Sequence, residues 1–99
     1  MSQEHIAQLY TLTDGASDAA FARARAGHLK SFRPMPLDDL RVRLASLEPQ
    51  VAAADARVMR CLKELKYGEG RQAFNQALSL NAELAALREA LEERRVMMS

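Results

Sequence analysis

The side chains that could do chemistry are few in this sequence, and their spacing suits neither a catalytic nor a metal site. The two histidines, His5 and His28, fall on different expected elements, without cysteine or acidic residues at ligand spacing. A metal site needs three or four converging ligands. We therefore expect no bound metal, and we interpret both histidines as ordinary surface or edge residues.

Cys61 is the only cysteine, so no disulfide can form within the chain, which suits a reducing compartment. It falls on the apolar side of an expected helix, where a buried thiol behaves as a small hydrophobe. A reactive thiol needs an electropositive, partly open setting. Arg57, Arg60 and Lys63 are near in sequence but point elsewhere on the helix. An intermolecular disulfide or a redox switch stays open as the alternative to core packing.

No grouping of residues is typical of an enzyme. Two pairs of neighbouring carboxylates, at 38–39 and 92–93, diverge on a helix, whereas general acid–base catalysis needs groups that converge in a pocket. The glycines at 68–70 lack the strand and the lysine of a phosphate-binding loop. We expect a non-enzymatic protein with no cofactor and no small-molecule substrate.

The charge is nearly balanced, with 14 basic and 13 acidic residues and a formal net charge of +1. No segment forms the basic stripe of a nucleic-acid interface, so we expect no nucleic acid as a partner. A strip of four basic residues interrupted by acids is interpreted as a solvated helix face: Arg57, Arg60, Lys63 and Lys66. Recognition of an acidic partner by this strip is the alternative.

We also expect no association with a membrane. A nearly neutral chain has no long-range attraction to anionic lipids, and no stretch approaches the ~20 apolar residues of a membrane span. The first ten residues lack the basic and apolar regions of a secretory signal. A cytoplasmic location is the expectation that follows.

The strongest pattern in the chain is an apolar stripe that begins after two closely spaced prolines. Its members follow alternating steps of three and four residues, which predicts a long helix: Leu37, Leu40, Leu44, Leu47, Val51, Ala54, Val58, Cys61 and Leu65. Pro36 suits the first position of this helix, and Asp38 and Asp39 suit its first turn. Pro49 falls on the outward side, and the unbroken stripe favours a kink there over a break.

A second long helix is expected after a short loop that contains glycine. Gly68 is placed to end the first long helix in the left-handed conformation. Because the loop is short, the next helix, over 71–95, should fold back antiparallel. Its side facing the first helix is expected to be formed by Ala73, Ala77, Leu80, Leu84, Leu87 and Leu91.

Residues 1–33 are expected to form one or two short helices, over 2–12 and 18–30. Pro34 removes the preceding residue from helical geometry, which makes residues 31–40 a rigid elbow. The apolar side of the second short helix is marked by Phe21, Leu29 and Phe32. Whether this side packs on the long helices or on a partner stays open at this point.

The sequence thus predicts one all-α domain, with short N-terminal helices over 1–33 and an antiparallel helical hairpin over 34–99. A chain of 99 residues buries a modest share of its surface. Apolar residues beside the hairpin seam need another surface: Met59, Leu62, Phe74 and Leu78. The N-terminal helices can cover part of them and a second copy the rest, so we expect a homodimer with a four-helix core.

From the prolines onward the layout resembles the TraM-type quorum-sensing antiactivators. The match begins with a Pro-x-x-Asp-Leu helix start, formed here by Pro36, Asp39 and Leu40. The helix runs to Leu65, and a loop with Gly68 and Gly70 leads to a second Ala/Leu-rich helix that continues from Phe74. The resemblance covers layout more than identity and leaves out the N-terminal third. It implies a small dimeric protein that binds and disables a transcription activator.

Taken together, the sequence favours a small helical regulator that acts by protein–protein binding, through helix-in-groove or bundle-completing contacts. The partner implied by the resemblance is a transcription regulator. The alternative is an export or assembly chaperone that holds a helical client protein with the same surfaces. The candidate contact residues for a partner or a second copy are Phe21, Leu29, Phe32, Met59, Leu62, Phe74 and Leu78.

Overall fold

The computed structural model describes residues 16–98, which form three α-helices: α2 (Ala16–Phe32), α3 (Leu37–Lys63) and α4 (Tyr67–Met98). The described residues contain no strand, so the prediction of an all-helical chain is confirmed. The short helix expected over 2–12 lies outside the described residues. The elbow between α2 and α3 falls at the prolines, as the sequence predicts.

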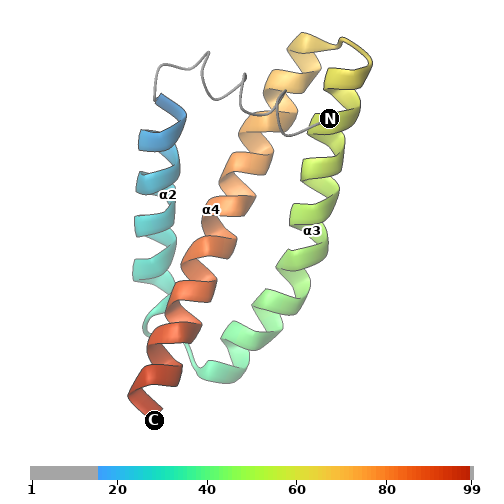
Figure 1. Cartoon of the computed structure of the whole chain (residues 1–99). Helices are drawn as coiled ribbons and strands as arrows, with labels where there is room; N and C mark the ends of the chain where they lie inside the picture. Colours follow the sequence, from blue (N-terminus) through green and yellow to red (C-terminus); the bar gives the residue numbers. More distant parts are fainter. Residues whose placement is uncertain (1–15, 99) are drawn as a thin grey trace.

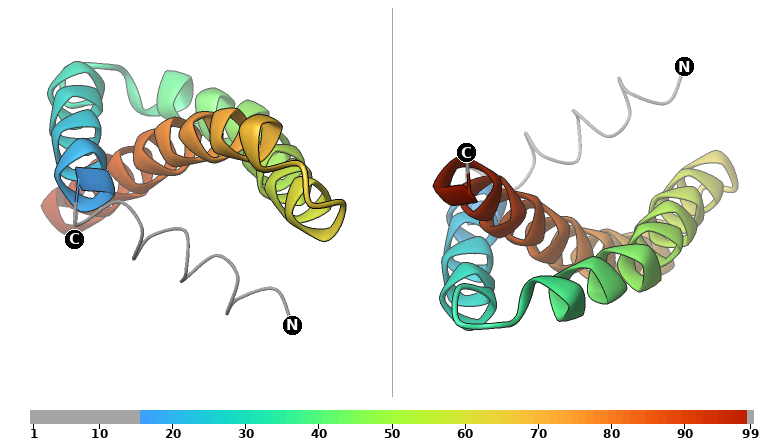
Figure 2. Two further views of the ribbon diagram at one scale, coloured as in Figure 1. Left: turned by 90° about the horizontal axis from the view of Figure 1, so that it is seen from above. Right: turned by 90° about the horizontal axis from the view of Figure 1, so that it is seen from below.

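The long helix α4 is the centre of the arrangement. α3 runs antiparallel along one side of α4, and α2 lies along another side, parallel to α4 (Figure 1). α2 and α3 both pack closely on α4 but hardly contact each other. The views along the helices show that the elbow joining α2 to α3 crosses one face of α4 (Figure 2).

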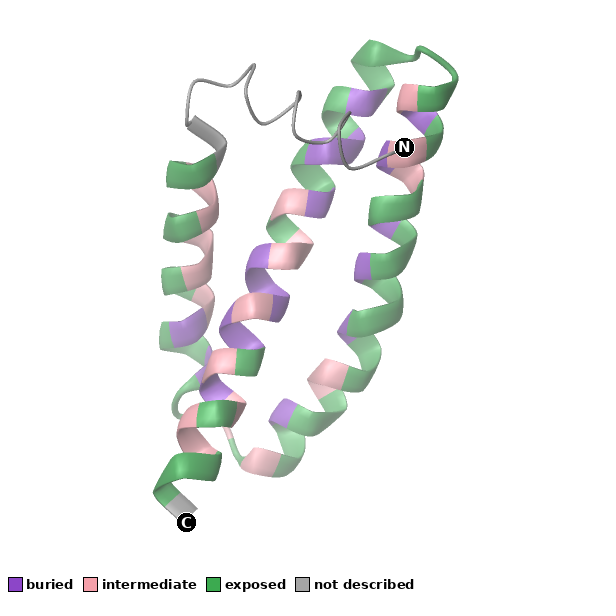
Figure 3. Cartoon of the chain, viewed as in Figure 1, coloured by how far each residue is buried: buried purple, intermediate pink, exposed green. Residues whose placement is uncertain are grey.

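The core is formed where the apolar sides of all three helices meet. One cluster joins α2 to the first half of α3 and to α4: Leu29, Phe32, Leu40, Leu47, Val51, Leu84, Ala86, Leu87 and Ala90. The second cluster lies between α3 and α4 near their loop: Ala54, Val58, Cys61, Ala73, Phe74 and Ala77. The sides of the helices that face each other are buried, and most outer sides are exposed (Figure 3).

Small residues let α4 lie close to two neighbours at once. Ala82 and Ala86 have no exposed surface, and Ala90 is 2% exposed. Residues four apart lie on one side of a helix, and small side chains there permit a short distance between helix axes. This alanine row lies on the side of α4 whose Glu89 and Glu93 bind α2.

The helix α3 continues through Pro49 and bends along its length (Figure 1). Pro49 is exposed, whereas Leu47 and Val51 on either side of it are buried. The missing amide hydrogen of proline therefore falls on the solvent side, where the helix tolerates a curve. The apolar side of α3 stays in register against α4 along its whole length.

The end of α3 differs from the sequence expectation. Its last turn closes as a Schellman motif, in which the amides of Leu65 and Lys66 donate to the carbonyls of Leu62 (3.1 Å) and Cys61 (2.8 Å). The left-handed residue is Leu65, with φ of 58°, and not Gly68, which lies in the first turn of α4. Leu65 therefore leaves the apolar stripe and is 68% exposed.

Gly70 lies in the same region. It is buried, and a Cβ atom built there would lie 3.4 Å from the Cβ atom of Cys61, which is an ordinary van der Waals contact. The start of α4 therefore packs against the end of α3, and alanine would fit at this position.

Replacing Leu65 by glycine should stabilise the protein. A left-handed backbone costs a residue with a Cβ atom about 1–2 kcal/mol, and glycine loses about 0.5–1 kcal/mol more entropy on folding. The expected net gain for Leu65→Gly is about 0.5–1 kcal/mol in urea unfolding followed by circular dichroism. Leu65→Ala keeps the strained Cβ atom and should change stability little, so equal stability of the two variants would contradict this explanation.

The central position of α4 predicts a much larger effect at Leu87, which has no exposed surface. Leu87→Ala should lower the free energy of unfolding by about 2–5 kcal/mol, because it removes buried methyl groups and leaves a cavity. The same urea titration measures it, with the exposed Leu65→Ala as control. A loss below about 1 kcal/mol would mean that α4 is not tightly packed at this position.

Candidate protein-binding surfaces

The structure places three of the seven predicted contact residues inside the chain. Leu29 and Phe32 of α2 are 8% and 6% exposed and pack in the same cluster as Leu87 of α4. Phe74 is 6% exposed and packs between α3 and α4. The apolar side of α2 therefore lies on its own chain, and contact of these three residues with a partner stays a prediction.

The other four predicted contact residues are half-buried: Phe21, Met59, Leu62 and Leu78. Leu62 and Leu78 pack against the cluster near the loop. They offer part of their surface to a neighbour, and Phe21 lies on a different helix, α2.

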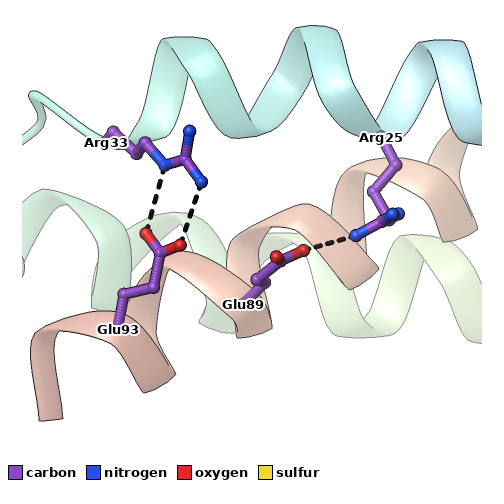
Figure 4. A network of polar contacts seen from close by, with 4 residues as sticks. All are labelled: Arg25, Arg33, Glu89 and Glu93. Carbon is purple, nitrogen blue, oxygen red and sulfur yellow. Dashed lines mark hydrogen bonds and ion pairs between the residues drawn. The ribbon is translucent and has the colours of Figure 1, made fainter. Parts of the chain in front are cut away.

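A set of arginine–glutamate pairs holds α2 on α4, and we call it the α2 clamp (Figure 4). Arg33 binds Glu93 with both ends of its guanidinium group, at 3.2 Å from Nε to Oε1 and 3.0 Å from Nη2 to Oε2. Arg25 binds Glu89 at 2.5 Å. Two-point pairs of this kind fix orientation better than a single ion pair.

Arg94 completes the α2 clamp from the side of α4. Its Nη2 atom donates to the carbonyl oxygens of Arg33 and Met35, which follow the end of α2. A cation at the carboxyl end of a helix satisfies free carbonyl groups and suits the helix dipole. Sequence reasoning missed the clamp because its partners are 59 to 64 residues apart.

The α2 clamp also shifts the ionisation of its members. The hydrogen bond from Arg33 lowers the pKa of Glu93, and the same bond raises the pKa of Arg33. Within α4, the hydrogen bond from Arg95 lowers the pKa of Glu92 in the same way. An arginine hydrogen bond thus lowers the pKa of both Glu92 and Glu93, but only Glu93 connects two helices.

A different ion pair links α3 to α4. Arg43 binds Glu83, which is 9% exposed and is the one buried charged residue in the described part of the chain. Loss of Arg43 would leave the charge of Glu83 with little access to water, which is costly. This pair therefore fixes the position of α3 along α4.

The carboxyl end of α4 carries an exposed apolar surface. Val96 and Met97 are 62% and 81% exposed. With Glu89, Glu92 and Glu93 they line an open hollow of about 480 Å³, which we call the C-terminal groove. All three glutamates bind arginines of the same chain, so their charges are partly neutralised and the groove offers mainly apolar contacts.

The described side chains that could do chemistry, His28 and Cys61, take part in helix packing. The ring of His28 stacks on Phe32, with centroids 6.0 Å apart and an angle of 18° between the planes. Cys61 is buried in the cluster near the loop. Within residues 16–98 no group of three or more histidine, cysteine or acidic residues could hold a metal ion. None of the described helices is long and apolar enough to cross a membrane.

Comparison with known proteins adds no further constraint. A scan against protein-family models finds no match, and searches of curated proteins and of solved structures find none either. Inference about function therefore rests on the surfaces of the described helices.

Weakening the α2 clamp should loosen α2 alone. Glu93→Gln removes the charge that binds Arg33, so the backbone amides of α2 should exchange with deuterium faster at neutral pH, while those of α3 keep their protection. Glu92→Gln is the matched control, because its arginine partner lies on the same helix. Faster exchange of α2 in both variants, or in neither, would contradict the role of the clamp.

The α2 clamp also predicts a pH dependence. A carboxylate whose pKa is lower in the folded chain stabilises the fold above its ordinary pKa of 4.5, and this contribution disappears as the pH falls through the lowered value. The stability of the natural chain should therefore fall more steeply on acidification than that of Glu93→Gln. Urea unfolding at a series of pH values from neutral down to about pH 3 measures the two slopes.

Proposed function

We propose that this chain is a small non-enzymatic helical regulator that acts by binding another protein and works as a homodimer in the cytoplasm. The observation that carries the proposal is the C-terminal groove. There, Val96 and Met97 expose their side chains beside a hollow of about 480 Å³. Covering adjacent apolar side chains releases water and favours association, which makes such a surface a candidate contact site.

The chemistry of the C-terminal groove favours an amphipathic helix as the bound element. Met97 is flexible and polarisable, so it adapts to apolar side chains of different shapes. The glutamates beside it already bind arginines and do not require a basic partner. A helix whose apolar side lies in the groove would bury Val96 and Met97 while its polar side faces water.

The resemblance to the TraM-type antiactivators suggests a transcription activator as the partner. Pro36, Asp39 and Leu40 lie at the start of α3, and Gly68 and Gly70 lie in the first turn of α4. Under this proposal, the chain would disable the activator by occupying a helical surface that the activator needs. The alternative is an export or assembly chaperone that holds a helical client in the same groove.

A tagged form of the full chain tests the proposal. We expect one protein to co-purify from the native host, to resist high salt because the contact is apolar, and to be lost with Val96→Ser/Met97→Ser. The control is Gln72→Ser, an exposed substitution in the first turns of α4, which should keep the partner. Retention of the same protein by the double variant would exclude the C-terminal groove as its site.

The identity of the captured protein then separates the two roles. If it is a transcription activator, addition of purified chain should abolish its binding to DNA in a gel-shift experiment, and Val96→Ser/Met97→Ser should not. A secreted or structural client supports the chaperone role instead. Binding of DNA by the chain itself at low salt would contradict both roles.

A further inference from the structure

The side of α3 that faces away from α4 carries a second apolar stripe, which we call the outer stripe. Its members again follow alternating steps of three and four residues: Val42, Ala45, Pro49, Ala52, Ala56 and Met59. Val42 is 69% exposed, Met59 is half-buried and the others are exposed. In Figure 3 the side of α3 turned away from α4 is exposed along its length.

A helix that is apolar on two sides is stabilised when a neighbour covers each of these sides. Among the described helices, α3 packs extensively on α4 alone. The alternating spacing of the outer stripe is that of a helix seam, which pairs best with another helix of the same spacing. The outer stripe is therefore suited to a helix that the described fold does not provide.

The two ends of the outer stripe carry opposite charges. Asp38 lies four residues before Val42 and Lys63 lies four residues after Met59, so both continue the spacing of the outer stripe. Both are exposed, and within the described residues neither side chain takes part in a hydrogen bond or an ion pair. A partner helix that suits this stripe would bring basic residues to its start and acidic residues to its end.

A second copy of α3 meets both conditions when it lies antiparallel. The spacing of the outer stripe is the same read from either end, so two antiparallel stripes match residue for residue. Val42 then lies opposite Met59, Ala45 opposite Ala56, and Pro49 opposite Ala52, each pair occurring twice about a two-fold axis.

The same placement also matches the charges. Asp38 comes opposite Lys63 at both ends of the contact. A parallel arrangement would instead bring like charges together at each end. We propose that the outer stripe of α3 is the surface through which two copies of this chain associate, antiparallel about a two-fold axis beside residues 50 and 51.

The centre of this contact suits close packing. Ala45, Ala52 and Ala56 have short side chains that permit a small distance between helix axes. Two features oppose the contact. Arg41 comes level with Arg60, although both side chains are exposed and can extend into water. Glu48 and Asp55 also approach their counterparts along one edge, but these two carboxylates already have partners on α4, with Glu48 lying 3.9 Å from Arg88 and Asp55 accepting a hydrogen bond from Asn81 at 3.0 Å.

This inference deepens the homodimer part of the proposed function and assigns it to a surface separate from the C-terminal groove. The groove residues belong to α4, and none of them belongs to the outer stripe. The capture experiment above tests the groove, whereas the measurements below test α3. Either can fail without the other.

Light scattering after size-exclusion chromatography tests the contact first. The natural chain should elute at twice its mass of 11.0 kDa at high micromolar concentration. Ala52→Arg brings two bulky cations to the centre and should give a folded monomer, with helicity checked by circular dichroism. Gln72→Arg, on the exposed surface of α4, is the matched control and should stay dimeric.

Charge reversal tests the antiparallel register. Asp38→Lys alone and Lys63→Asp alone should each raise the dissociation constant about tenfold, because each replaces two attractive pairs by two repulsive ones. The double variant Asp38→Lys/Lys63→Asp restores opposite charges and should return the constant close to that of the natural chain. The double variant carries both of the changes that act on the helix ends of the monomer. Its recovered affinity must therefore come from the contact between the two copies.

Cross-linking locates the residues directly. A mixture of Ala45→Cys chains and Ala56→Cys chains should form a cross-linked dimer with a short bismaleimide, and neither variant should do so alone. The native Cys61 is buried, so it should not compete. A monomer at about 100 µM, a dimer that survives Ala52→Arg, or cross-linking of Ala45→Cys with itself would each overturn the proposal.

Discussion

The fold depends on the burial of α4 on two sides. Leu87 and Ala86 have no exposed surface because α2 and α3 both pack on α4 while hardly contacting each other. Small residues let α2 approach one side of α4, and leucines meet the seam of α3 on another. Since the outer helices hardly contact each other, nearly all long-range contacts between the described helices involve α4.

The two outer helices are attached to α4 in different ways. α3 has a long apolar seam, reinforced by the pair of Arg43 with the buried Glu83. α2 contributes Leu29 and Phe32 to the core and otherwise relies on the exposed pairs of the α2 clamp. Exposed ion pairs contribute little stability each and weaken with salt. Of the three described helices, α2 is therefore the one expected to separate first under stress.

Each outer helix packs on α4 with one side only, and this explains why apolar surfaces remain uncovered. A short chain has too few residues to enclose all its apolar sides. The C-terminal groove and the outer stripe of α3 remain at the surface on different helices. This separation is what allows one surface to be proposed for a partner protein and the other for a second copy, without competition between them.

Local sequence patterns are enough to predict the helical class, the elbow at the prolines and the seam of α3, because proline geometry and apolar spacing act over a few residues. They also mark Leu29 and Phe32 as the apolar side of α2. Three features become visible only in the folded chain: this side packs on α4, Arg33 binds Glu93, and Leu65 rather than a glycine takes the left-handed position. Those features depend on contacts between residues far apart in the chain, or on where two helices fit together, and no local pattern encodes either.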